Sequence, residues 1–382
     1  MKHINHLITS GLILLFFLIL SQPTLAQEDH GIHVGGYGEL HYNDVVYDAN
    51  GEETAGTLDF HRFALLFGYD FNDWISFNSE VELEHTLLET AEGGEIALKQ
   101  AYIDLALKQA LGIRAGLMLV PVGIVNTEAE PNTFYSVERP TVEETLIPST
   151  WSESGVGIYG NTSSGLSYQA YLMAGLAPNG IDGREGITGA TQNGFKSSTA
   201  NLALTGRLDY QFNHNFTAGA SYFYSSLNNT IEEGKAEKIS ALDKANLNLA
   251  EIHAIYETER FEARGLFSYS HLAEAESINN TFNNDAGESQ LGGYVTLAYD
   301  MLPSLAPATS QQLYIFGRYG SFDTQYTTKA IPDNPEFHRT DYTFGLSYFP
   351  IEEVAFKADY QILTSAGDKS IRQLNLGVAY EF

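Results

Sequence analysis

Only a few side chains in this chain of 382 residues have the types and spacing that covalent chemistry requires. Ser270 and His271 could act as a nucleophile and its base, but adjacent residues of a strand point to opposite faces and cannot share the necessary hydrogen bond. Residues 35–38, Gly-Gly-Tyr-Gly, resemble part of a phosphate-binding loop, but no helix pattern follows them. We therefore expect no enzyme activity and no catalytic residues.

Metal and cofactor chemistry has equally little support in the sequence. The 11 histidines lack the H-x-x-x-H spacing of a helical zinc site. Residues 279–288 offer oxygen ligands for calcium but not in the EF-hand order, so we interpret them as a solvated loop. With no cysteine in the chain, disulfides, cysteine-bound metal centres and thiol catalysis are excluded. We expect no metal site and no cofactor.

Composition narrows the class of protein further. The chain has 48 acidic and 20 basic residues, a formal net charge of -28, which repels nucleic acid and excludes it as a partner. A mean hydropathy of -0.16 is too polar for a helical membrane protein. The 23 Tyr and 22 Phe are too many aromatic residues for a disordered chain.

The amino terminus predicts export. Met-Lys-His is followed by an apolar run over residues 7–20 and by small residues at Thr24 and Ala26, which is the pattern of a secretory signal peptide. A transmembrane anchor is the alternative, but the run is short for roughly 30 Å of hydrocarbon and no stop-transfer flank follows it. We expect a signal peptide over residues 1–26 and one mature domain over residues 27–382.

The mature chain repeats stretches of about ten residues in which every second side chain is apolar. A soluble β-sandwich also alternates in this way. A membrane barrel is favoured because charges of both signs lie in mid-strand, aromatic residues gather at strand ends, and tight turns alternate with long polar loops. We expect an all-β fold, a transmembrane antiparallel β-barrel of about 16 strands with short periplasmic turns and long external loops.

The same pattern predicts where each strand begins. The expected starting points are near His33, Leu58, Trp74, Ile96, Ile113, Ser154, Leu166, Asn201, Phe216, Asn248, Phe261, Gln290, Gln312, Arg339, Val354 and Arg372. The chain ends on Phe382, two residues after Tyr380, and this alternating aromatic end resembles the signal that the outer-membrane assembly machinery reads.

If the apolar side chains face lipid, the residues between them face a lumen. The residues expected to line it are Arg62, Glu80, Glu82, Glu84, Tyr102, Asp104, Arg114, Arg207, Asp209, Glu251, Glu262, Arg264, Arg318, Lys357 and Asp359. Two interpretations stay open: ion pairs that stiffen a polar wall, or a transverse field that orients and filters ions. Pairing is favoured for any single residue, because neighbours such as Arg207 and Asp209 could simply pair.

The third external loop, residues 126–150, is too long for a hairpin and contains apolar residues that a surface loop does not need, such as Phe134 and Ile147. If it folds inward, it buries these residues and narrows the channel. The charged residues that it would then place near the lumen are Glu128, Glu130, Glu138, Arg139, Glu143 and Glu144. The alternative is an acidic surface loop that covers the barrel mouth.

Several segments resemble the phosphate-selective porin O and P family. They are residues 59–63 (DFHRF), 77–82 (FNSEVE), 99–104 (KQAYID), 113–116 (IRAG), 138–140 (ERP), 147–151 (IPSTW) and 155–158 (GVGI). The resemblance implies a porin of about 16 strands that assembles as a trimer. Phosphate-selective members line the passage with arginine and lysine, whereas the corresponding loop here has five Glu and one Arg.

We therefore expect an outer-membrane porin of a Gram-negative bacterium, with a water-filled channel for passive diffusion of small hydrophilic solutes and ions. We expect it to be general or mildly cation-favouring. The alternatives are an anion- or phosphate-selective porin and a non-conducting barrel for adhesion or surface display. The expected partners are outer-membrane lipid and lipopolysaccharide, the assembly machinery, other copies in a homotrimer, and small hydrophilic solutes.

Overall fold

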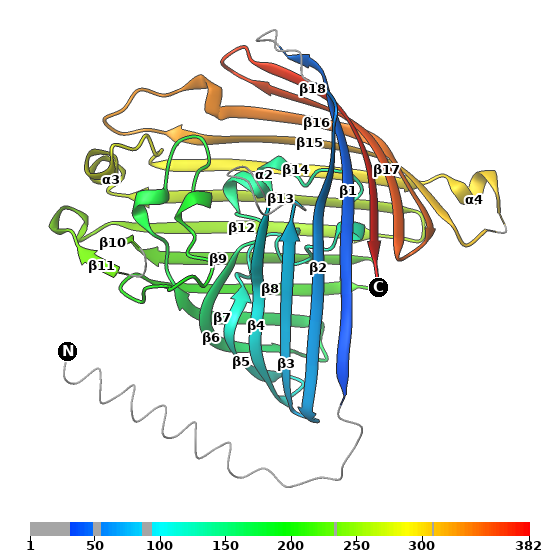
Figure 1. The fold of residues 1–382 in the computed structure, drawn as a ribbon, viewed down its shortest axis with the longest axis horizontal. Helices are drawn as coiled ribbons and strands as arrows, with labels where there is room; N and C mark the ends of the chain where they lie inside the picture. The colour runs from blue at the N-terminus through cyan, green and yellow to red at the C-terminus, as the bar shows by residue number, and fades with distance from the viewer. Residues whose placement is uncertain (1–30, 49–54, 86–93, 233–234, 308) are drawn as a thin grey trace.

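The computed structural model describes residues 31–48, 55–85, 94–232, 235–307 and 309–382. The expected signal peptide, residues 1–26, lies outside them. Sixteen strands form one closed antiparallel barrel (Figure 1). They are β1 (Ile32–Asp48), β2 (Thr57–Asn72), β3 (Ile75–Glu84), β4 (Glu95–Lys108), β5 (Leu111–Leu119), β6 (Ser152–Asn161), β7 (Leu166–Ala174), β8 (Leu202–Asn213), β9 (Phe216–Ser226), β12 (Asn246–Glu257), β13 (Phe261–Ala273), β14 (Ser289–Asp300), β15 (Gln312–Thr327), β16 (His338–Ile351), β17 (Val354–Ser365) and β18 (Ser370–Glu381).

Each strand pairs with its neighbours in the chain, and the ring closes where β1 pairs with both β2 and β18. In the ring β12 follows β9, because β10 (Asn229–Glu232) and β11 (Lys235–Lys238) form a separate hairpin. The expected fold class is confirmed. Every barrel strand also begins within two residues of its expected starting point.

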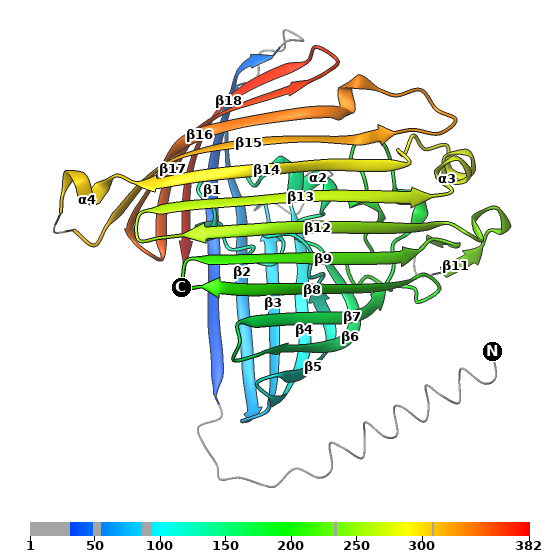
Figure 2. The same cartoon turned by 180° about the vertical axis from the view of Figure 1, so that it is seen from behind.

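The connections alternate in length and define two ends of the barrel. At the turn end the strands are joined by short turns, except that α4 (Leu302–Leu305) lies between β14 and β15. The loop end carries α3 (Ala275–Phe282) and the β10–β11 hairpin, and Figure 2 shows these opposite α4. The loops also contain short 3-10 helices at Pro131–Thr133, Pro178–Gly180, Thr188–Ala190, Ser240–Leu242 and Pro335–Phe337. Among the described residues, no helix is both long and apolar enough to cross a bilayer.

The outer face of the ring is apolar. Leu204 on β8, Ile252 on β12 and Phe344 on β16 expose 57%, 59% and 52% of their surface, while the residues beside them in sequence face inward. Such side chains are stable in contact with lipid, and closure of the ring leaves no strand edge unpaired in the hydrocarbon.

Part of the inner face is also apolar, and it holds the connection between β5 and β6, residues 120–151. Ile147 and Trp151 of this connection are completely buried with the wall residues Phe223 and Leu249, and the rings of Trp151 and Phe223 lie 4.5 Å apart. Burial of each such side chain contributes roughly 1.5–3 kcal/mol. Figures 1 and 2 both place α2 (Thr141–Leu146), part of this connection, inside the ring.

The connection begins at residue 120, earlier than the expected residue 126. Val120, Val122 and Ile124 alternate as strand residues do, but all three are buried inside the barrel. The two roots of the connection are joined where Val120 N donates to Trp151 O at 2.9 Å. The segment from Val120 to Ile124 therefore has an apolar residue at every second position, although it is not a strand that faces lipid.

Two β-bulges change which side chains face inward. Between β1 and β2, Glu39 is opposite Arg62 and His41 is opposite Asp59, which leaves an extra residue in β2. Between β3 and β4, Glu80 is opposite Gln100 and the next residue of β3 is opposite Leu98, which leaves Lys99 as the extra residue. A bulge locally breaks the strict alternation of faces.

Candidate functional site

The inner face of β1 to β3 carries a buried arginine that connects the wall to the loop over residues 120–151. Arg62 Nε donates to Glu39 Oε1 at 2.8 Å, and its Nη1 lies 3.4 Å from Glu82. Its Nη2 donates to the backbone oxygen of Ala129 in the loop at 2.9 Å. The guanidinium is thus neutralised by wall carboxylates and also binds the loop.

The remaining carboxylates of β3 have partners in the wall. Tyr37 donates to Glu80 at 2.6 Å. Lys99, turned inward at its bulge, lies 3.0 Å from Glu82 and 3.1 Å from Glu84. This row of acids is therefore paired across the strands, as expected if the charges stiffen a polar wall.

Arg114 on β5 is held in the same way. Its Nη2 donates to Asp104 at 2.9 Å, and the guanidinium carbon lies 4.4 Å from the ring centre of Tyr102 and 4.8 Å from that of Tyr159. Tyr159 also donates a hydrogen bond to Asp104. Stacking between two aromatic rings fixes the guanidinium as well as pairing it.

A compact network lies on the inner faces of β8 and β12. Arg207 Nε donates to Asp209 at 2.8 Å, and another of its nitrogens donates to the loop carbonyl of Gly123. His253 lies between Asp209, at 2.7 Å, and Glu251, at 2.8 Å. The expected pairing of Arg207 with Asp209 is thus present, with a second contact to the loop.

Arg264 and Arg318 occupy neighbouring parts of the wall. Arg264 Nε donates to Glu262, and the other oxygen of Glu262 accepts a 2.8 Å hydrogen bond from Tyr135 of the loop. Arg318 Nη1 donates to Ser136 Oγ at 2.6 Å. Both positions connect a charged wall residue to the same short segment of the loop.

Lys357 on β17 makes the densest contact with the loop. Its ammonium donates to the backbone oxygens of Pro131, Phe134 and Ser136, the last two at 2.7 and 3.0 Å, and lies 4.2 Å from the ring centre of Phe134. Only 4% of the residue is exposed. Three charge-assisted hydrogen bonds from one ammonium fix the loop against the strands at the carboxyl end of the chain.

The next loop residues are fixed by polar groups of two strands, β1 and β17. Val137 N donates to Asp359 at 2.6 Å, and Glu138 accepts a 2.8 Å hydrogen bond from Asn43 and lies 3.2 Å from His41. Burial by itself favours the neutral acid, but the contacts with His41 and Asn43 hold the pKa of Glu138 below its usual value.

Two adjacent acids of α2 have opposite environments. Glu143 is completely buried and accepts hydrogen bonds from Tyr294 at 2.6 Å and from Val125 N at 2.9 Å, and burial raises its pKa. Glu144 is exposed. Of the other charged loop residues, Glu128 is exposed and Glu130 and Arg139 are half-buried.

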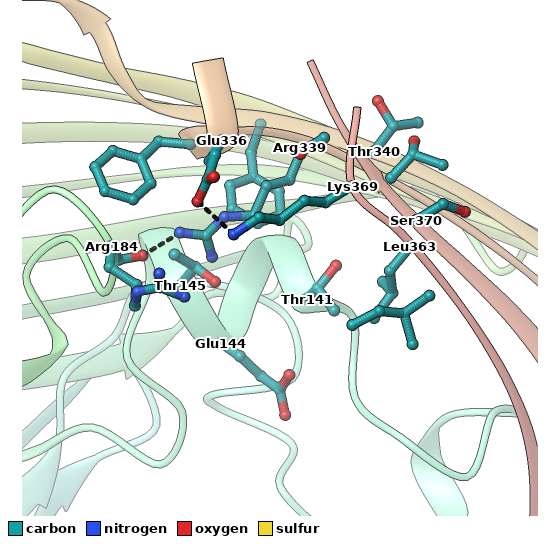
Figure 3. A pocket seen from close by; sticks show the side chains of 15 residues that line it. Thr141, Glu144, Thr145, Arg184, Glu336, Arg339, Thr340, Leu363, Lys369 and Ser370 are labelled. Atoms are coloured by element: carbon teal, nitrogen blue, oxygen red, sulfur yellow. Dashed lines mark hydrogen bonds and ion pairs between the residues drawn. The ribbon is translucent and has the colours of Figure 1, made fainter. Parts of the chain in front are cut away.

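A hollow of about 260 Å³ opens at the loop end, between α2 and strands β15 to β18 (Figure 3). Arg184, Arg339, Lys369, Glu336 and Glu144 line it. Lys369 lies 2.8 Å from Glu336, and Arg339 donates to the backbone oxygen of Arg184. Figure 3 shows Glu144 apart from both of these contacts. The hollow is large enough for a small solute and presents charges of both signs.

A second hollow, of about 370 Å³, lies near the turn end against β1 to β4. Its lining includes His33, Asn78, Glu80, Gln100 and Tyr102. The lining of this hollow also includes Val34 and Phe67, so polar and apolar side chains both contribute to it.

The end of the chain completes the ring. Phe382 exchanges two 2.9 Å backbone hydrogen bonds with Gly36, and its side chain is 62% exposed. Tyr380 lies on the last strand opposite Gly38. The roles of these two aromatic residues in assembly stay predictions.

All the lumen residues expected from the sequence take part in the interior contacts or line a hollow. Sequence reasoning missed Glu39, His41 and Lys99, although Tyr37, Glu39 and His41 alternate with the outward residues of the first strand. Lys99 had no such signal, because only the bulge turns it inward. It also missed a convergence of Asp59 with two histidines.

Comparison with known proteins gives matches over most of the chain. A family model described as phosphate-selective porin O and P matches residues 34–373. The chain is also 36% identical over 352 residues to an uncharacterized protein of Aquifex aeolicus (strain VF5), with 87% of this chain and 76% of the relative covered.

Solved structures share the fold at low sequence identity. OmpF of Salmonella typhi, in a complex with daunomycin, has a TM-score of 0.60 at 11% identity, and the match covers 92% of this chain and 98% of that one. OmpT of Vibrio cholerae, an outer membrane protein folded in vitro and described in a trimer form, has a TM-score of 0.55 at 12% identity, with 93% and 100% covered.

Proposed function

This chain belongs to the phosphate-selective porin O and P family, and on that premise we propose that its channel is general or mildly cation-favouring rather than phosphate-selective. As a porin it lies in the outer membrane of a Gram-negative bacterium and provides a channel for passive diffusion of small hydrophilic solutes. The proposal about selectivity rests on one observation, the commitment of the interior basic residues to other partners.

An anion-selective passage needs cations whose hydrogen-bond donors are free to replace the water around the ion. Here Arg114 and Arg264 bind wall carboxylates. The other four expected wall cations donate to the loop: Arg62, Arg207, Arg318 and Lys357. An anion would have to break these contacts to bind, and the loop would lose its attachment.

The acidic residues leave negative charge where solutes pass. Glu128 is exposed. Glu144 faces the hollow at the loop end, where desolvation and the nearby Glu138 raise its pKa to about 7, so that it is partly ionised at neutral pH, whereas the basic residues of the wall are mostly buried. We also propose that the loop over residues 126–150 forms the narrowest part of the channel, because the connection to which it belongs is attached on both sides of the ring, at Gly123 by Arg207 of β8 and at Ser136 by Lys357 of β17.

The reversal potential of purified protein in a planar bilayer, measured across a potassium chloride gradient, tests this proposal. We expect a value near zero or of the sign for cation preference. Glu144→Gln should move it toward anions, and Glu143→Gln is the matched control, because the neighbouring acid is buried. A reversal potential that favours chloride or phosphate in the wild type would overturn the proposal, and the absence of any conductance would overturn the channel itself.

Selectivity for anions remains the second candidate because of the hollow at the loop end. It gathers Arg184, Arg339 and Lys369 around about 260 Å³. If this hollow selects anions, inorganic phosphate should inhibit the chloride current, and Arg184→Gln should remove the inhibition. No inhibition at all is the result expected from our proposal.

Export, assembly and oligomeric state belong to the same proposal. Residues 1–26 would direct export and be removed, and Tyr380 and Phe382 would be read by the outer-membrane assembly machinery. A homotrimer in contact with lipid and lipopolysaccharide is supported by the family and by the trimer form of the Vibrio cholerae protein. The mass of the purified native protein tests the trimer, and Phe382→Ser tests the assembly signal.

A further inference from the structure

Three potential metal ligands converge at the loop end of β2 and β3. Asp59 Oδ2 lies 2.6 Å from His85 Nδ1 and 3.6 Å from His61 Nδ1. One ligand atom from each residue lies within 4.8 Å of the others. All three side chains are partly exposed, with 32%, 39% and 51% of Asp59, His61 and His85 accessible, so an ion in solution can reach them.

The local backbone explains why these residues meet. The extra residue of β2 between Asp59 and Arg62 breaks the alternation of faces, and His61 stacks on the interior residue His41 with ring centres 4.4 Å apart. His85 has a positive φ of 48° directly after β3, and its backbone N–H donates to His61 O at 3.1 Å. The turned backbone thus directs His85 toward the β2 pair.

From this geometry we propose that Asp59, His61 and His85 bind one divalent transition-metal ion of the zinc class at the external rim of the barrel. Ligand atoms roughly 2.0–2.1 Å from a tetrahedral zinc lie about 3.4 Å apart. The Asp59–His61 separation of 3.6 Å already fits. The ligand atoms of Asp59 and His85 must move apart by less than about 1 Å, and the metal then takes the place of the proton that the two side chains share.

The donor set decides the class of ion. Two imidazole nitrogens and one carboxylate suit zinc and its neighbours in the first transition series, whereas calcium and magnesium prefer sites made of oxygen. Three protein ligands leave a fourth position for water or a solute. The structure also contains a natural comparison. His33 and Asp70 form a 2.6 Å pair on the neighbouring strands near the turn end, and no third ligand joins them among the residues that the structure describes.

The site lies close to the loop. His61 stacks on His41. His41 in turn lies 3.2 Å from Glu39 of its own strand and 3.2 Å from Glu138 of the loop. A bound ion would add positive charge beside this group and should reduce the current carried by cations. That consequence rests on the proposed channel function, so direct binding is the primary measurement.

Calorimetric titration of the purified full-length protein with zinc chloride tests the site. We expect one ion per chain, with at least about a 10-fold loss of affinity in His85→Asn and in His61→Gln. Asn tolerates the positive φ at position 85, so the backbone is preserved. Cobalt(II) gives a second readout, because a four-coordinate site has visible absorption that both variants should lose.

The control is His33→Asn, which removes a histidine from the similar pair near the turn end and should leave zinc affinity unchanged. Wild-type protein that binds no zinc, or variants at positions 61 and 85 that bind as the wild type does, would overturn the site. An equal loss in His33→Asn would do so as well. Zinc binding without conductance in the wild type would refute the channel and leave the metal site standing.

Discussion

Lys357 is the residue whose removal tests most directly how the loop is held. Its buried ammonium donates to the backbone oxygens of three loop residues, Pro131, Phe134 and Ser136. Lys357→Met keeps the length of the side chain but removes every donor. Three carbonyl oxygens then lose their partner while the apolar contacts of the loop are kept.

The magnitude follows from these contacts. Hydrogen bonds to a charged group contribute about 1.5–3 kcal/mol each, and the sum is reduced because the variant no longer buries a charge. We take a net loss of about 3 kcal/mol in the free energy that seats the loop, which corresponds to about a 100-fold larger population of the released loop. The barrel strands themselves keep all their backbone hydrogen bonds.

Proteolysis of the folded barrel in detergent measures that population, because a protease cuts a released loop and spares a seated one. We expect cleavage within residues 126–150 to accelerate by about 100-fold, and single-channel currents to become noisier. Lys99→Met is the matched control. It removes a lysine from the same wall, where Lys99 pairs with Glu82 and Glu84 instead of the loop.

Cleavage of Lys357→Met at the wild-type rate would refute the reasoning, since the three hydrogen bonds would then contribute nothing to seating the loop. Equal acceleration in Lys99→Met would refute it in another way. The effect would then come from the general charge of the lumen and not from these contacts.

Three further changes probe the loop. Asn126→Leu removes the acceptor of the Trp151 backbone N–H and leaves that donor buried. The free energy that seats the loop should fall by about 2 kcal/mol, so the loop should be cleaved faster, and an unchanged cleavage rate would contradict this. Gly123→Ala places a Cβ 2.5 Å from a Glu143 oxygen at a φ of +88°, and should lower loop stability by about 1–3 kcal/mol in the same assay. Burial raises the pKa of Glu143, so its contribution is fully present below pH ~4.3 and is lost as pH rises through the raised value. Wild-type loops should therefore become easier to cleave as the pH rises above ~4.3, while cleavage of Glu143→Gln should change less with pH, and equal slopes in the two proteins would exclude this titration.

The barrel could be predicted from sequence because lipid makes a strict demand. Each strand must present apolar residues to one side, so the pattern of period two carries both the strand positions and their faces. Residues such as Leu204 and Leu208 on β8 show the pattern clearly, and both are exposed on the outer face. The same demand placed Arg207 and Asp209 on the inner face.

The interior could be predicted only in part, since no solvent imposes a pattern there. Val120 and Val122 alternate like a strand but seat the loop, and the inward position of Lys99 depends on a bulge that the sequence does not mark. Asp59 and His85 are far apart in the chain, so their contact follows from strand register. These features depend on three-dimensional packing and backbone irregularity.

The partners of the loop also set an order of events during biogenesis. Tyr135 O, Phe134 O and Val137 N bind Ser347, Lys357 and Asp359, groups that lie 212, 223 and 222 residues further along the chain. Earlier strands hold other parts of the loop, but residues 134–137 have none of these three partners until the last strands of the barrel are in place, and closing so long a span is entropically slow. Full seating of the loop thus marks a finished barrel, and a nascent one truncated before β16 would leave residues 134–137 open to periplasmic proteases.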